Sequence, residues 1–159
     1  MLKKLKQNSQ EGFTIIEVLI VLAIAGLIIL IVFLAVPALQ RNSRNTQRNN
    51  DASIVGGAVN ECLTNKNGQV ASCDTAAKVK AVGLDMSKIQ QLTTVNVDSA
   101  VPTAPAPGTL DTVNVGFGKG CNDAGDDLSA SAGAARQGVM LYRIEIQGSG
   151  DGVVRCQEI

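Results

Sequence analysis

The residues most able to do chemistry in this chain are four cysteines: Cys62, Cys73, Cys121 and Cys156. No two of them have the Cys-x-x-Cys spacing that is typical of zinc sites and thioredoxin-like redox sites. Their number is even and all four follow a candidate membrane-targeting segment, so they predict disulfides in an oxidising compartment. Histidine is absent, and with it the commonest general base and metal ligand. We therefore expect no enzyme activity and no cofactor.

One acidic turn is the only candidate metal site in the sequence. It contains Asp123, Asp126 and Asp127 close to Asn122. Calcium binds oxygen-rich turns of this kind, but the spacing of an EF-hand loop and its terminal glutamate are missing. An exposed polar turn is the favoured interpretation, and calcium binding is the alternative.

A second charged pattern consists of Arg41, Arg44 and Arg48, whose spacing places them on one face of a helix. They could form a solvated face, bind anionic lipid headgroups or meet acids on adjacent subunits, and the first two are favoured. No aromatic residue lies nearby to stack on bases. Because the formal net charge is zero, nucleic acid stays an unsupported partner.

The longest apolar segment runs from Val18 to Leu39, 22 residues without a charge. At about 1.5 Å per residue, it spans roughly 30 Å of hydrocarbon and predicts one transmembrane helix. Glu17 stands directly before it, where a carboxylate costs about 3 kcal/mol. Gly26 and Pro37 weaken the helix, and we expect a kink or local melting at Pro37. By themselves, Glu17 and Pro37 fit an interfacial residue and a tolerated kink equally well.

The orientation of this span does not follow from charge counting, because three lysines precede it and three arginines follow it. All four cysteines follow the span and need an oxidising side. We therefore expect the N-terminus in the cytoplasm and the C-terminus outside.

The stretch Gly12-Phe13-Thr14-Ile15-Ile16-Glu17, after a short lysine-bearing leader and before a long apolar helix, resembles the N-terminal signature of type IV prepilins. The resemblance implies that prepilin peptidase, a membrane aspartic peptidase, cuts after Gly12 and methylates the new N-terminus at Phe13. Residues 13–159 would then form a mature chain of 147 residues (159 − 12). The resemblance covers about 35 residues, and the rest of the chain resembles the family only in layout.

The resemblance also implies a role for Glu17, which matches the conserved glutamate of the family. It would accept the Phe13 ammonium of a neighbouring subunit, which would neutralise two charges that are each costly in lipid. Gly26 matches the helix-breaking glycine of the family. The family's proline stands three residues earlier, where this chain has Leu34, so Pro37 is a displaced match.

Beyond the span, the sequence predicts an α+β fold. The apolar positions Ile54, Val55, Ala58, Val59, Cys62 and Leu63 indicate that one helix continues from about Thr14 to Leu63 with a stripe that needs a cover. Short helical turns are expected within 74–92, with Thr75–Val82 closed by Gly83 and Asp85 as a cap. Strands are expected at 93–97, 112–117, 138–147 and 153–156, with the turn of the last hairpin at 148–152. These strands would form a small antiparallel sheet over the stripe.

The corresponding domains are a leader at 1–12, a transmembrane or filament-core helix at 13–39, the outer half of the helix at 40–65 and a globular head at 66–159. Four cysteines allow three disulfide pairings. Cys62–Cys73 with Cys121–Cys156 is preferred because each bond closes a local loop, and the second bond resembles the C-terminal disulfide loop of the pilin family.

We interpret the chain as a structural subunit of a type IV pilus, held in the cytoplasmic membrane before assembly and extracellular afterwards. Its partners would be copies of itself, prepilin peptidase and the membrane assembly platform. The alternative is a pseudopilin of a type II secretion or DNA-uptake system. A third hypothesis, an enzyme or ligand-binding domain on an anchor, leaves Glu17 unexplained.

Overall fold

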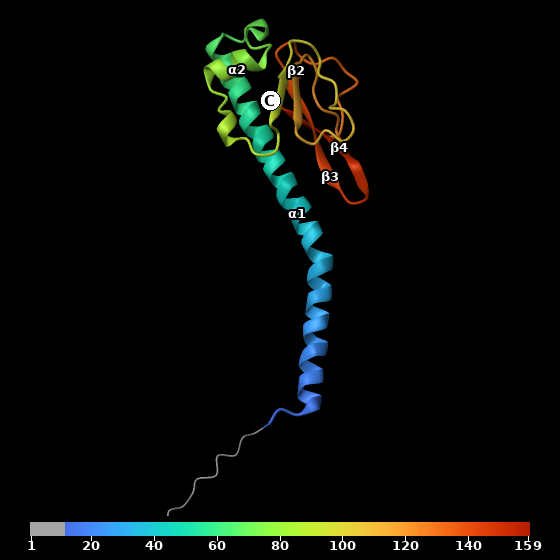
Figure 1. Ribbon diagram of the computed structural model, residues 1–159. Helices are drawn as coiled ribbons and strands as arrows, with labels where there is room; N and C mark the ends of the chain where they lie inside the picture. The colour runs from blue at the N-terminus through green and yellow to red at the C-terminus, as the bar shows by residue number, and fades with distance from the viewer. Residues whose placement is uncertain (1–11) are drawn as a thin grey trace, which may run out of the picture. The chain divides into compact units, whose positions relative to one another are not determined.

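The computed structural model of the chain describes residues 12–159 (Figure 1). Most of the expected leader, including its lysines, lies outside the described residues. The chain divides into two compact units, Met1–Ala38 and Leu39–Ile159. Helix α1 (Ile15–Asn65) contributes its first part to one unit and its second part to the other.

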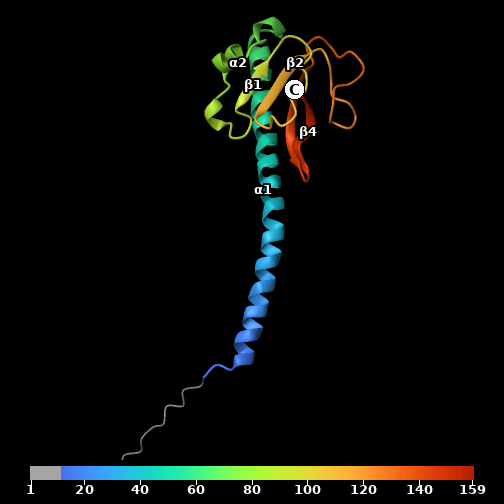
Figure 2. The same ribbon diagram turned by 45° about the vertical axis from the view of Figure 1, so that its right-hand side comes forward.

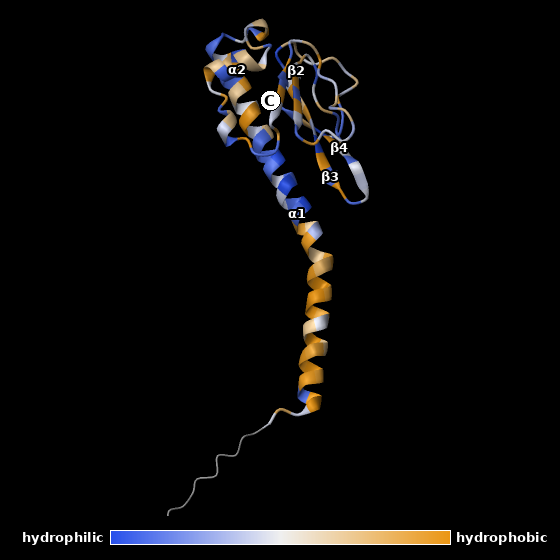
Figure 3. Ribbon diagram, viewed as in Figure 1, coloured by the Kyte–Doolittle hydropathy of each residue, from blue (hydrophilic) through white to orange (hydrophobic). Residues whose placement is uncertain are grey.

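In the first unit, α1 is apolar on all sides and exposed on all sides. Every described residue before Leu39 is exposed, and the hydrophobic colour surrounds the helix in Figure 3. This helix is long and apolar enough to cross a membrane. Helix α1 is continuous through both Gly26 and Pro37 in the single chain, and the kink or local melting expected there stays a prediction.

In the second unit, α1 buries one face against a sheet. Of the stripe expected from the periodicity, Val55, Ala58, Val59 and Cys62 are buried. Ile54 and Leu63 are partly buried, and Ala52 is a further buried position that was not expected. Gly56 also lies on this buried face, and its lack of a side chain allows the sheet to approach the helix closely. A Cβ at that position would lie 2.7 Å from the Met140 methyl.

The sheet contains four strands in the order β1 (Thr94–Val97), β2 (Thr112–Phe117), β3 (Gly138–Ile146) and β4 (Ser149–Glu158). The β2–β3 and β3–β4 pairs are antiparallel, but β1 pairs with β2 in parallel. The expectation of a fully antiparallel sheet is therefore wrong for one pair. Residues 98–111 explain the difference, because this long, proline-containing connector carries the chain back to the end of the sheet where β1 began.

The turn between β3 and β4 is also tighter than expected. Only Gln147 and Gly148 separate the strands, and the residues assigned to a turn at 149–152 belong to β4. The register between the strands shifts at Ile144 and Ile146, so the extra residues of β4 form a bulge. Gly152 is required there, since its φ is +66° and a Cβ would lie 2.7 Å from the Ile144 carbonyl oxygen.

The segment between α1 and β1 contains short helices capped as the sequence indicates. Helix α2 (Ala76–Val82) starts at Thr75, whose hydroxyl accepts the Lys78 N–H at 3.3 Å. Asp85 caps a 3₁₀ turn (Met86–Lys88) through the Ser87 N–H at 3.0 Å. Figure 2 shows β1 beside α2 in this part of the unit.

The core of the second unit lies between α1 and the sheet. Its largest fully buried side chains include Leu92, Met140 and Leu141. Two disulfides hold its margins, Cys62–Cys73 and Cys121–Cys156, with Cα–Cα distances of 6.0 and 5.6 Å. This is the pairing preferred from the sequence.

Candidate functional site

The bond between Gly12 and Phe13 lies in an exposed segment that precedes α1. Both residues are exposed and neither belongs to a helix or strand. No atom lies within 4 Å of the position that a Cβ on Gly12 would take. The junction is therefore accessible from solvent and lies outside the helix.

Thr14 and Glu17 begin α1 as a reciprocal pair. The Thr14 hydroxyl accepts the Glu17 N–H at 3.3 Å, and the Glu17 carboxylate accepts the Thr14 N–H at 3.3 Å and the Thr14 hydroxyl at 3.2 Å. This is a capping box. The sequence reasoning missed it, although the Thr-x-x-Glu spacing before an apolar run is its known signal.

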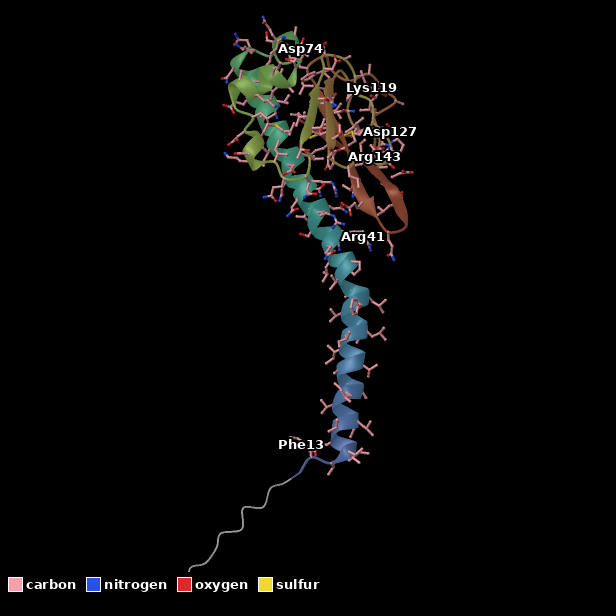
Figure 4. The ribbon with its side chains drawn as sticks, viewed as in Figure 1. Phe13, Arg41, Asp74, Lys119, Asp127 and Arg143 are labelled. Atoms are coloured by element: carbon pink, nitrogen blue, oxygen red, sulfur yellow. A yellow bond between two sulfur atoms is a disulfide. The ribbon has the colours of Figure 1, made fainter. Side chains whose placement is uncertain are left out.

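The Glu17 carboxylate therefore has local hydrogen-bond donors but no cation partner among residues 12–159. Beside it, Phe13, Val18, Val21 and Leu22 line a shallow hollow on the same unit. Figure 4 shows Phe13 at the start of this helix. An exposed acid next to an apolar hollow suits a ligand that combines a cation with a hydrophobic group.

Two of the three arginines after the apolar run are engaged within the subunit and do not form the solvated or headgroup-binding face that the sequence favoured. Arg44 Nε donates to Glu145 Oε1 at 2.8 Å, and Arg48 Nη2 lies 2.9 Å from the same oxygen. Arg48 is only 4% exposed, and its Nε donates to the Leu110 carbonyl at 2.9 Å. Arg41 takes no part in the salt bridges found among the described residues. Two of the three arginines thus serve the fold of their own subunit.

Glu145 carries the clearest electrostatic signal of the second unit. Hydrogen bonds from Arg44 and Arg48 outweigh burial and lower the pKa of the Glu145 carboxyl to about 2, while Glu145 raises the pKa of Arg44. Asn45 adds to this contact, since its side-chain amide donates to the Glu145 carbonyl and accepts the Glu145 N–H, both at 2.8 Å. The Asn45 amide thus supplies hydrogen-bond partners to the backbone of β3 past Tyr142, where the pairing with β2 has ended.

A buried carboxylate on α1 was not anticipated either. Asp51 is buried, and one of its oxygens accepts the backbone N–H groups of Gln90, Gln91 and Leu92 at 3.1, 2.6 and 3.0 Å. It fastens the segment before β1 to the helix. Sequence periodicity gave no signal for this contact, because its partners are backbone groups about 40 residues away.

The acidic turn at 122–127 is organised around an amide. Asn122 Oδ1 accepts the N–H groups of Asp126 and Asp127 at 3.1 and 3.3 Å, and Asn122 Nδ2 donates to Asp126 at 2.7 Å. Asp123 is exposed. Within residues 12–159, no three Cys, Asp or Glu side chains gather in a way that could hold a metal ion. The structure does not bring Asp123, Asp126 and Asp127 together as a calcium site.

Comparison with known proteins adds one match. A family model described as the prokaryotic N-terminal methylation motif matches residues 7–33. No curated protein and no solved structure matches the chain. The matched segment contains the exposed Gly12–Phe13 bond, the capping box and most of the uncharged apolar run, as far as Phe33. This chain carries the type IV prepilin signature.

Proposed function

We propose that this protein is a structural subunit of a type IV pilus. Prepilin peptidase would remove residues 1–12 and methylate Phe13, and the mature chain would polymerise through the first half of α1. The observation that carries the proposal is the apolar helix directly after the processing motif, which is exposed on all sides within its own subunit. Such a surface must be covered by lipid before assembly and by the helices of other subunits after assembly.

Glu17 would set the register between neighbouring subunits during assembly. In the single chain, its carboxylate is held by Thr14. Cleavage would create an ammonium group at Phe13, and the ammonium of an incoming copy could take the hollow beside Glu17 together with its phenyl ring. The pairing would neutralise both charges where water is scarce. Before assembly, the same helix would hold the subunit in the cytoplasmic membrane, with the second unit outside.

The processing step is tested by intact mass of the surface protein. We expect the loss of Met1–Gly12 and the gain of one methyl group. A chain that keeps its first 12 residues in cells with active peptidase would refute the prepilin assignment.

The assembly role of Glu17 is tested by two substitutions with different effects on the capping box. Glu17→Ala removes both the cap and the charge, whereas Glu17→Gln keeps an N3 side chain that suits a capping box but has no charge. We expect both variants to be cleaved and neither to assemble. If Glu17→Gln formed normal filaments, helix capping would be sufficient and the charge pairing would be wrong.

A pseudopilin would share the same leader and the same helix. Imaging of sheared surface material separates the two functions. Long filaments that disappear when the gene is deleted support the pilus subunit. A deletion strain that lacks a secretion or DNA-uptake activity, with no filament in the parent, supports the pseudopilin.

A further inference from the structure

The β3–β4 hairpin lies along the part of α1 that follows the apolar run. Tyr142 Oη donates to Asn49 Oδ1 at 2.9 Å, and three residues later Glu145 contacts Asn45. Residue numbers rise along β3 while they fall along α1. The hairpin therefore points toward the residues of the second unit that are closest in sequence to the apolar run (Figure 4).

These two contacts also indicate how far the hairpin reaches. Three residues of β3 correspond to four residues of α1, or about 6 Å along the helix. The same advance from Glu145 places Gly148 level with Arg41, about 3 Å along the helix from Leu39. Leu39 is the last residue of the uncharged run. The headgroup layer is about 5–7 Å thick on each side of the hydrocarbon, so a bilayer whose hydrocarbon ended at Leu39 would have the turn within reach of its headgroups.

The chemistry of this end of the hairpin suits a lipid surface. We define the hairpin tip as residues 146–149. Ile146 is 41% exposed, and it is one of the three large apolar side chains of the second unit outside α1 that are exposed. The turn itself, Gln147-Gly148-Ser149, is polar but uncharged.

The charges around the hairpin tip favour anionic lipid. Residues 41–48 of α1 and residues 143–153 of the hairpin carry four cations (Arg41, Arg44, Arg48 and Arg143) and two acids (Glu145 and Asp151), which leaves two net positive charges. Glu145 is already neutralised by Arg44 and Arg48. Arg41 is the cation closest to the apolar run, and each basic residue near an anionic leaflet contributes about 1 kcal/mol.

We propose that the hairpin tip is a second membrane contact of the unassembled subunit. Ile146 would enter the headgroup layer of an anionic bilayer, and Arg41 would bind the lipid phosphates. The inference rests on the membrane anchoring in the proposed function.

The experiment uses single-tryptophan variants of the full chain, since the protein has no tryptophan. They are reconstituted in vesicles of phosphatidylglycerol and phosphatidylcholine whose acyl chains are brominated close to the headgroup. Ile146→Trp reports on the hairpin tip. Val101→Trp is the matched control, because Val101 is 42% exposed and lies beside Gly118 at the opposite end of the sheet. Leu30→Trp reports on the span and uses lipids brominated deeper in the chain.

We expect bromine quenching and a blue-shifted emission for Ile146→Trp, and neither change for Val101→Trp. Replacing Arg41 by alanine, or phosphatidylglycerol by phosphatidylcholine, should weaken the quenching of Ile146→Trp. Equal emission of Ile146→Trp and Val101→Trp, with Leu30→Trp quenched, would overturn the inference and leave the anchoring intact. A blue shift of the Ile146→Trp emission that grows with protein density, without quenching by bromine, would show that the tip contacts a second copy of the chain. That result would also overturn the inference. An unquenched Leu30→Trp would overturn the anchoring and this inference together.

Discussion

Replacing Glu145 by glutamine removes the ion pairs with Arg44 and Arg48 that help to join the β3–β4 hairpin to α1. The carboxyl pKa is lowered from 4.5 to about 2, which corresponds to about 3 kcal/mol of stability at neutral pH. Solvent reaches the Arg44 side chain, which is 41% exposed, and screening reduces the contribution to about 2 kcal/mol. Glutamine also leaves the buried Arg48 without its counter-charge, so we expect a total loss of about 2–4 kcal/mol.

Tyr142 provides the assay, because it is the only tyrosine and the chain has no tryptophan. It is buried in the core between α1 and the sheet, so its fluorescence follows unfolding of the second unit. Urea titrations are made on the full chain in detergent micelles. Glu61→Gln is the matched control, since Glu61 is exposed and enters no salt bridge or side-chain hydrogen bond among residues 12–159. It should change the free energy of unfolding by less than about 0.5 kcal/mol.

The pH dependence separates the charge from the shape of the side chain. Because the pKa of Glu145 is lowered in the folded state, its stabilisation is complete above about pH 4.5 and is lost as the pH falls toward 2. The difference between the parent protein and Glu145→Gln should shrink over that window. Burial raises the pKa of Tyr142, so the probe stays protonated throughout. A difference that is constant with pH, or a Glu145→Gln variant as stable as Glu61→Gln, would refute the electrostatic account.

The other predictions use the same titration. Asp51→Asn removes the charge that accepts three backbone N–H groups and should cost about 2 kcal/mol; a neutral effect would show that the amide replaces the carboxylate fully. Gly116→Ala places a Cβ 2.2 Å from the Ala100 carbonyl oxygen and should cost about 3 kcal/mol, whereas Gly57→Ala meets nothing within 4 Å and should stabilise the helix by about 0.5–1 kcal/mol. The opposite order would contradict this packing. Replacing both Cys121 and Cys156 by serine should cost about 3 kcal/mol, and no loss would mean that the bond constrains little.

Most elements of the fold follow from local sequence. The expected helix from Thr14 to Leu63 differs by at most two residues at each end from α1 (Ile15–Asn65), and β2 has the bounds that alternation predicts. These features depend on side-chain periodicity and on caps within one turn, which a sequence displays directly. The disulfide pairing could also be predicted from the sequence, because each bond closes a local loop.

The errors concern pairs of segments that are distant in the chain. The parallel pairing of β1 with β2 depends on where the connector 98–111 returns, and the bulge of β4 depends on how it aligns with β3. Neither property is encoded in the alternation of one strand, because a strand can keep its inner face in either orientation. The spacing placed Arg44 and Arg48 on one face of the helix, but their shared partner Glu145 lies about 100 residues away.

The sequence by itself determined the Gly12–Phe13 junction, the Thr14–Glu17 spacing and the apolar span, because each is a property of consecutive residues. Only the tertiary structure decided that the polar face of α1 is occupied by its own subunit, with Arg44 and Arg48 on Glu145 and Asp51 on the backbone of residues 90–92. The physical reason is range. Hydropathy and helix capping act within a few residues, whereas the ion pairs of Glu145 exist only because folding brings distant side chains within about 4 Å of one another.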